Sequence, residues 1–195
     1  MPEQPFEEFN IQYAYRSIRT FFYHFKVSDA VSYLEIILRA ATSFKLWTKE
    51  EPAQLLLYME MLQELIAAAL EIYYGHSIRK DAIIKQDNET GILLQQYFVN
   101  NASDCNRWNC FPRSLTLQQY YNPYKAIKKL AKYMSVQEWE AFIKDCTEYA
   151  LLKATITDVR TAYDILLIRL RLLQLIEACH LLHVRTNEKI ENDAS

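Results

Sequence analysis

Apolar side chains recur every three or four residues along most of this chain, which is the spacing that gathers them on one face of an α-helix. The segment from about 7 to 26 is a clear case. Ile18, Phe21 and Phe25 share its inward face, whereas Arg16 falls on its polar face. The repeated pattern predicts an all-α bundle of about six helices, in which short links make sequential neighbours antiparallel.

Capping residues mark where the next helices begin and end. Ser28 is expected to cap a second helix that reaches about Phe44. Thr48 and Glu51 have the spacing of a capping box for a third helix. Gly75 is expected to end that helix in a left-handed backbone conformation, which glycine adopts without steric cost.

The chain from 76 to about 121 breaks the helical pattern. It is polar and rich in asparagine, and a short helix is expected only at about 92–98. A connection of this length is unusual inside a compact domain and is commonly functional or mobile. Helical spacing returns at Asn122, the expected cap of one helix, and Ser135 with Glu138 forms a capping box that opens the next helix.

A last long helix is expected to open at Thr155 or Thr157 and to reach about Arg185. This is the most apolar stretch, but charged residues such as Asp164 and Glu177 interrupt it. A membrane-spanning helix needs about 20 nearly charge-free residues, so the pattern predicts a core helix instead.

Length and composition fit one soluble globular domain. The 195 residues are half apolar and a quarter charged, with a formal net charge of -2. The whole chain is expected to form a single helical domain with four successive parts: a three-helix part (1–75), an irregular arm (76–121), a second three-helix part (122–186) and a frayed tail (187–195).

Glycine is scarce, and this excludes several kinds of chemistry. Only Gly75 and Gly91 are present, so neither a dinucleotide-binding nor a phosphate-binding glycine loop can be written. No cofactor is expected. The first residues lack a basic region followed by an apolar run, so no secretory signal is recognised and a cytoplasmic location is expected.

The cysteines raise the question of a metal site. Cys105 and Cys110, together with Cys179 and His183, would supply the residue types of a zinc site. The spacing is unlike that of zinc knuckles, and a small thiol on an apolar helix face is ordinary core packing. We therefore expect four reduced thiols and no metal, with zinc at Cys105 and Cys110 left as an alternative.

Three polar residues fall on the apolar side of the last helix. Arg169, His180 and His183 lie there among leucines and isoleucines, where an unpaired charge is costly. Ion pairing at the rim of a buried helix explains them most simply. The alternative is an internal pocket that binds an anion or small molecule through these groups.

Basic and aromatic residues cluster between 104 and 132. On one helix, Lys125, Lys128, Lys129 and Lys132 fall within about 100° of one another. Cations interleaved with aromatics suit phosphate contacts and base stacking, and they suit an acidic protein surface equally well. A solvated lysine face beside a loop whose Trp108 fills the core would also explain them. The candidate binding residues are Arg107, Trp108, Arg113, Tyr120, Tyr121 and the four lysines.

The segment RTFFYH, from Arg19 to His24, resembles the R-x4-6-H motif of helical HEPN-type ribonucleases. The resemblance covers six residues and implies phosphodiester cleavage by this arginine and histidine. The helical pattern, however, places Arg19 on the outer face and His24 on the inner face.

The C-terminal half, from LTLQQYYNPYKAIKKLAKYM through LLQLIEACHLL, resembles helical proteins of Bacteroidota. The shared features are an NP helix start, a following helix with a tryptophan, and a late LIEA helix. The resemblance implies an all-helical fold in a bacterial cytoplasm and brings no activity or site residues.

The sequence favours a non-enzymatic interaction or regulatory protein that docks an acidic protein or a nucleic acid through the basic and aromatic surface. A HEPN-like ribonuclease and a bundle with an internal pocket are the alternatives. No membrane contact is expected, and self-assembly into a homo-oligomer stays open.

Overall fold

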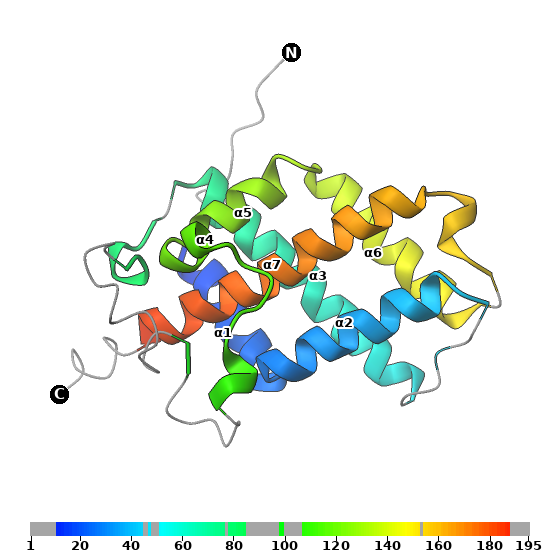
Figure 1. Ribbon diagram of the computed structural model, residues 1–195, viewed down its shortest axis with the longest axis horizontal. Helices are drawn as coiled ribbons and strands as arrows, with labels where there is room; N and C mark the ends of the chain where they lie inside the picture. The colour runs from blue at the N-terminus through cyan, green and yellow to red at the C-terminus, as the bar shows by residue number, and fades with distance from the viewer. Residues whose placement is uncertain are drawn as a thin grey trace, which may run out of the picture.

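The computed structural model describes residues 11–44, 47, 51–76, 78–84, 98–99, 107–152 and 154–187, and these ranges contain helices and no strand. The all-α prediction is therefore confirmed (Figure 1). The α-helices are α1 (Ile11–His24), α2 (Val27–Ala41), α3 (Pro52–Tyr74), α4 (Leu117–Tyr121), α5 (Tyr124–Ala131), α6 (Val136–Leu151) and α7 (Ala162–Asn187). Short 3-10 turns are η1 (Lys80–Ala82), η4 (Arg107–Cys110) and η5 (Ile156–Asp158).

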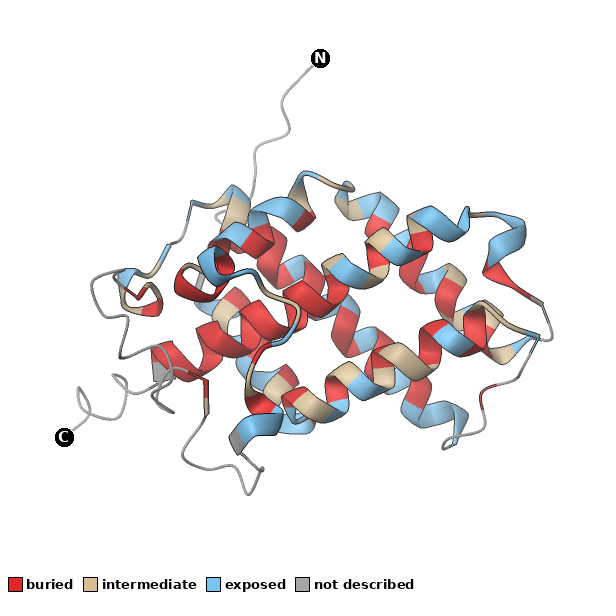
Figure 2. Cartoon of the chain, viewed as in Figure 1, coloured by how far each residue is buried: buried red, intermediate tan, exposed pale blue. Residues whose placement is uncertain are grey.

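Helix α7 runs through the middle of the molecule and organises the fold. It packs against α1, α2, α3, α4, α5 and η1 (Figure 1). From Leu172 to Thr186 every residue of α7 is buried, which Figure 2 shows as a continuous red stretch. The apolar character that distinguishes this helix in the sequence is thus explained by helices on nearly all sides, without a bilayer. Among the described helices, none is both long enough and apolar enough to cross a membrane.

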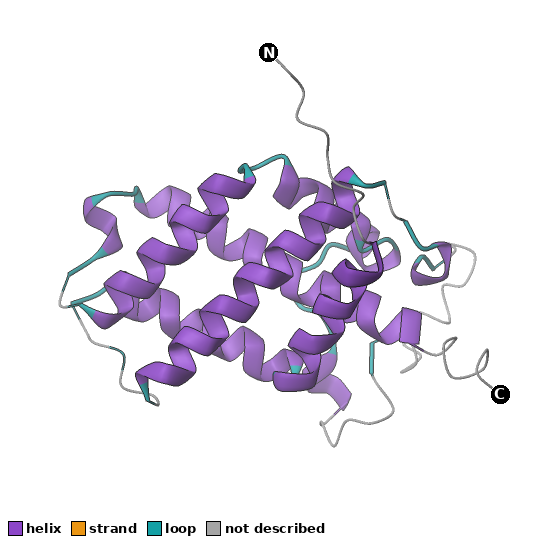
Figure 3. Cartoon of the chain, turned by 180° about the vertical axis from the view of Figure 1, so that it is seen from behind, coloured by secondary structure: helices purple, strands orange, loops and turns teal. Residues whose placement is uncertain are grey.

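Aromatic packing joins α1, α2 and α3. The Tyr58 ring lies 5.2 Å from that of Phe25 and 5.4 Å from that of Tyr33, measured between centroids. Its buried hydroxyl donates a 2.7 Å hydrogen bond to the carbonyl oxygen of Ala30. A tyrosine can be fully buried at low cost only when its hydroxyl has such a partner. Figure 3 shows the same helices from behind.

Three of the predicted helix starts are wrong. Glu51, expected three residues after the cap of the third helix, instead directly precedes the first residue of α3 and makes no side-chain capping hydrogen bond. Lys26, not Ser28, precedes the first residue of α2, and Ser28 lies inside the helix with its hydroxyl on Asp29. The last helix opens neither at Thr155 nor at Thr157. Those residues build η5, and Thr161 caps α7 by accepting a 3.1 Å hydrogen bond from the Asp164 amide.

The predicted end of α3 is correct in position but not in conformation. Gly75 follows the last residue of α3 with φ of -75°, and His76, with φ of 52°, is the left-handed residue. The switch out of the helix therefore falls one residue later than predicted. Histidine tolerates this conformation better than most residues with a Cβ.

The central arm contains a helix that the periodicity did not predict. Thr116 and Gln119 form a capping box that opens α4. The predicted box of Ser135 and Glu138 is confirmed at the start of α6. Asn122 also acts as predicted, because its Oδ1 accepts a hydrogen bond from the Tyr124 amide at the start of α5. Of the helix expected at 92–98, all but Phe98 lies outside the described residues.

Candidate interaction surface

Helix α5 presents a row of lysines to solvent from a firmly packed base. Its apolar side, including Ile127 and Leu130, is buried against α3 and α7. The opposite side carries the exposed Lys125, Lys128 and Lys129, and the exposed Lys132, directly after the last residue of α5, continues the row. None of them takes part in an ion pair with any residue that the structure describes. The face is therefore a compact positive surface without an ion-pair partner in the part of the chain that the structure describes.

A tyrosine pair fixes the start of α5. The hydroxyls of Tyr124 and Tyr15 lie 2.7 Å apart, and the Arg79 amide donates a 2.9 Å hydrogen bond to the Tyr124 hydroxyl. These contacts connect α5 with α1 and with the segment after α3. Burial raises the pKa of Tyr124, so the pair stays neutral and the hydrogen bonds persist at physiological pH.

A buried arginine joins α4 and η1 to the end of α7. Arg185 Nη1 donates hydrogen bonds to the carbonyl oxygens of Tyr120 (2.8 Å) and Ala82 (3.1 Å). Its guanidinium also lies over the Tyr120 ring, 4.9 Å from the centroid. Tyr120 and Tyr121 are both buried. The prediction that these two tyrosines form an exposed binding surface is therefore wrong, since their rings are part of the core.

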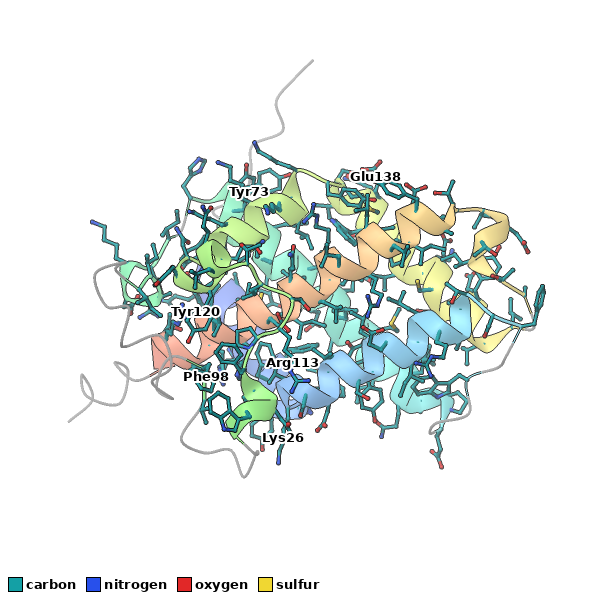
Figure 4. All side chains as sticks on the ribbon, in the orientation of Figure 1. Lys26, Tyr73, Phe98, Arg113, Tyr120 and Glu138 are labelled. Carbon is teal, nitrogen blue, oxygen red and sulfur yellow. The ribbon has the colours of Figure 1, made fainter. Side chains whose placement is uncertain are left out.

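The loop between η4 and α4 is held by a buried carboxylate on α7. Glu177 accepts hydrogen bonds from three successive backbone amides: Arg113 (2.8 Å), Ser114 (2.7 Å) and Leu115 (3.1 Å). Gln174, one turn earlier on α7, donates a 3.0 Å hydrogen bond to the Ser114 carbonyl. Figure 4 shows Arg113 beside α7, with Phe98 and Tyr120 nearby.

The electrostatics of Glu177 reflect two opposing causes. Burial raises the pKa of its carboxyl, and the hydrogen bonds from the loop amides act in the opposite direction. The loop is thus fixed from within, while the Arg113 side chain itself is exposed.

Trp108 does not fill the core, contrary to one interpretation of the sequence. Its side chain is 62% exposed, and it stacks at 6.4 Å on Phe98, which is buried beneath it beside Phe111. The residues that close this part of the core are therefore the two phenylalanines. The side chain of Arg107 is outside the described part of the chain.

The predicted basic and aromatic surface is divided into two places. The turn η4, which carries Trp108, packs beside α2, whereas α5 packs on α3, α4 and α7. Figure 1 shows α7 running between them. Trp108 and the four lysines do not form one contiguous surface, and the lysine face of α5 has to act by itself.

Arg169 is also separate from His180 and His183, the other two residues of the predicted pocket. Arg169 forms a two-point ion pair with Glu35 of α2, with distances of 2.9 and 2.5 Å. This contact raises the pKa of the guanidinium and occupies the group that the alternative interpretation assigned to an anion pocket. The pair agrees with the expected ion pairing at the rim of α7 and gives no support to an anion pocket built on Arg169.

The two histidines lie further along α7 in a buried aromatic setting. Phe22 stacks on His183 at 5.6 Å and meets His180 edge-on at 5.2 Å. Burial lowers the pKa of each histidine to about 4, so both are neutral at physiological pH. His180 Nε2 lies 3.1 Å from the Phe98 carbonyl oxygen, which places its proton on Nε2.

His180 also lines a cavity of about 150 Å³ between α7, the start of α2 and the loop at 109–113. Its neighbours there include Glu177, Cys110 and Ser28. Arg169 is not part of this lining. Only one of the three predicted pocket residues is therefore placed at this cavity.

Metal ligands do not converge in the described part of the chain. Cys110, Cys146 and Cys179 are buried, and no group of three or more potential ligands is found there. Burial raises the pKa of Cys146 and Cys179, which keeps both as thiols. Cys105, the other half of the alternative zinc pair, lies outside the described residues.

Arg19 and His24 do not meet as a catalytic pair. Five residues along an α-helix separate two side chains by about 140° around its axis. Both side chains are exposed, and His24, which was expected to face inward, contacts the exposed ring of Tyr23. The six-residue resemblance to HEPN ribonucleases therefore has no supporting geometry on α1.

A family model described as proteasome activator PA28, C-terminal, matches residues 58–176, which is more than half of the chain. The chain belongs to this family. The PA28 C-terminal match begins in α3 and ends in α7. It includes the whole of α5 and the loop at 113–115, and it stops one residue before Glu177. Searches of curated proteins and of solved structures find no match.

Membership of the PA28 C-terminal family agrees with the all-helical architecture. It places the chain among helical regulatory proteins that act by binding other proteins, in agreement with the broader prediction of an interaction or regulatory role. The residues of the interaction surface are not specified by this match. The resemblance to Bacteroidota proteins stays a prediction.

Proposed function

We propose that the protein is a non-catalytic regulator that docks the lysine face of α5, formed by Lys125, Lys128, Lys129 and Lys132, onto an acidic surface of a protein partner. The observation that carries this proposal is the arrangement of these four exposed lysines on a helix whose other side is buried. Because the backbone beneath is held by α3 and α7, little conformational freedom of the helix is lost on binding. A cytoplasmic location belongs to the same proposal.

The dimensions of the face set its electrostatic behaviour. Lys125 and Lys132 are seven residues apart, and a rise of about 1.5 Å per residue gives a row roughly 10 Å long. Four like charges within that length raise the local potential, and complementary acidic groups would speed association more than they strengthen the complex. With a Debye length of about 8 Å at physiological ionic strength, binding should weaken as salt is added.

The family description suggests which partner to test first. Since the family is described as an activator of the proteasome, a proteasome-type protease is the proposed partner. A nucleic acid is the alternative, and it is less favoured because Tyr120 and Tyr121 are buried and offer no stacking surface for bases. Assembly of several copies of the chain is compatible with either partner.

Co-sedimentation with purified 20S proteasome particles, combined with cleavage of a short fluorogenic peptide, tests this function. We expect the wild-type protein to sediment with the particles and to change the cleavage rate. A single-stranded RNA, which is also negatively charged, serves as the competing ligand. Absence of binding to particles together with tight, salt-sensitive RNA binding would overturn the proposal in favour of a nucleic-acid partner.

A further inference from the structure

The first half of α7 has an apolar face that the described helices leave open to solvent. Tyr163, Leu166 and Leu170 are 69%, 61% and 38% exposed. They recur at intervals of three and four residues, so they form one row along the helix. Figure 2 shows this partly exposed half beside the fully buried half that begins at Leu172. Single exposed apolar residues are ordinary on a protein surface, whereas an uninterrupted row is typical of a contact surface.

Two charges of opposite sign lie along one edge of this row. Asp164 and Arg171 are seven residues apart, which places them about 20° apart around the helix axis and about 10 Å apart along it. Neither is in an ion pair with any residue that the structure describes. Asp164 accepts a 2.6 Å hydrogen bond from the Thr161 hydroxyl, and Arg171 donates a 3.0 Å hydrogen bond to the Gln174 side chain. Both neighbours are neutral, so the two charges are not compensated there.

The opposite edge of the row carries no net charge. Arg169 lies there, and its guanidinium is paired with Glu35 of α2. A matching partner therefore needs an apolar row of its own and, along one edge only, a positive and a negative group in the reverse order. A partner surface of a single charge would match either Asp164 or Arg171 and would be repelled by the other.

A second copy of the chain has this pattern when its α7 runs antiparallel. Two identical surfaces that pack about a two-fold axis exchange contacts, so a residue on one side of the axis meets a residue at the same distance on the other side. With the axis midway between Asp164 and Arg171, each aspartate is level with the arginine of the other copy. Leu166 and Leu170 then lie on either side of the axis, so the apolar rows overlap as well. The face is therefore self-complementary in both charge and apolar surface.

We propose that two copies of the chain associate about a two-fold axis through the face formed by Tyr163, Leu166 and Leu170, with Asp164 of each copy opposite Arg171 of the other. The three apolar side chains expose on the order of a few hundred Å², and a standard interface covers about 800 Å² per partner. They are therefore the centre of the contact, and polar residues around them form its rim. Such a contact gives a reversible dimer, and because both copies use the same surface, assembly closes at two. It uses none of the α5 lysines, so it does not depend on the proposed function.

Sedimentation velocity of the full-length protein, from about 1 µM to about 100 µM, tests the proposal. We expect a monomer that becomes a dimer within this range. The combined L166E and L170E variant should dimerise about tenfold or more weakly, because it places charge at the centre of the contact. The control is the combined L56E and L57E variant in the first turns of α3, where the two leucines are 44% and 40% exposed, and it should dimerise as the wild type does. A monomer at every concentration, or an L166E and L170E variant that dimerises like its control, would overturn the proposal.

A charge swap tests the antiparallel arrangement itself. D164K alone and R171E alone should each weaken dimerisation about tenfold, because the two-fold axis makes every substitution count twice. The combined D164K and R171E variant should recover to within about threefold of the wild type, since opposite charges again face each other. Circular dichroism checks that each variant folds, and the leucine variants decide the question if a charge variant does not. A combined variant that is no better than the single ones, or an assembly larger than two copies, would overturn the two-fold arrangement.

Discussion

The carboxylate of Glu177 accepts a 2.7 Å hydrogen bond from the backbone amide of Ser114, 63 residues earlier in the chain. This contact, with those to the neighbouring amides, connects a loop without regular structure to the most buried helix of the bundle. The carboxylate thus does for the loop what a capping residue does for a helix end, since it supplies acceptors to amides that have none within their own segment.

Replacement of Glu177 with glutamine should destabilise the protein by about 2 kcal/mol or more. The substitution keeps the size of the side chain but turns one acceptor into a donor that faces backbone amides, and an unsatisfied buried amide costs about 1–3 kcal/mol. Urea unfolding measures this loss, and hydrogen exchange should speed up at residues 113–115. Glu148→Gln, on the exposed Lys144 pair, is the matched control and should change stability by less than about 0.5 kcal/mol. Equal effects of the two variants would contradict this role of Glu177.

Stability should fall as the pH is lowered from about 6.5 to about 4. His180 and His183 have folded-state pKa values of about 4, whereas an unfolded histidine titrates near 6.5. In that interval the unfolded chain binds more protons than the folded one, so the free energy of unfolding decreases with falling pH. Each pH unit corresponds to about 1.4 kcal/mol per histidine. The raised pKa of Glu177 acts in the opposite sense and offsets part of the loss.

Urea unfolding at several pH values measures this slope. Replacing both histidines with glutamine should make it shallower, whereas replacing the exposed His76 should leave it unchanged. A slope that is the same in all three proteins would show that other groups cause the acid sensitivity.

The ion pair of Arg169 and Glu35 should contribute only modestly to stability. Its side chains are 42% and 30% exposed, so solvent screens the attraction despite the two-point geometry. A double-mutant cycle with Arg169→Ala and Glu35→Ala should give a coupling free energy of about 0.5–1 kcal/mol. A coupling of several kcal/mol would mean that the pair is buried far more deeply than its exposure indicates.

Helix periodicity and capping residues were sufficient to predict the fold class and several helix ends. Ser135 with Glu138 is an example, because both partners of the capping box lie three residues apart and act locally. Thr161 and Asp164 also lie three residues apart and could have been recognised as a helix cap. Thr155 and Thr157 are threonines a few residues earlier that can cap a helix equally well, and they were chosen instead. The short helix α4 has a capping box at Thr116, yet five residues are too few to reveal a helical period.

The interaction surface was only partly predictable. The four lysines share a face because of helical geometry alone, and the structure leaves all four exposed. Tyr120 and Tyr121 were expected on the same surface as stacking aromatics. Contacts with distant residues, among them Arg185, bury them instead. Glu177 was visible only as a charged interruption in an apolar helix, because its three donors come from a loop more than 60 residues away.

The importance of the α5 lysine face for partner binding is tested most directly by charge reversal, with Lys125, Lys128, Lys129 and Lys132 replaced by glutamate, and by co-sedimentation of this variant with 20S proteasome particles. A matched variant reverses four exposed cations elsewhere: Arg16, Lys26, Arg39 and Lys80. Our account predicts that the α5 variant no longer sediments with the particles, that the matched variant does, and that the melting temperature of the α5 variant stays close to that of the wild type. Undiminished binding by a folded α5 variant would contradict it.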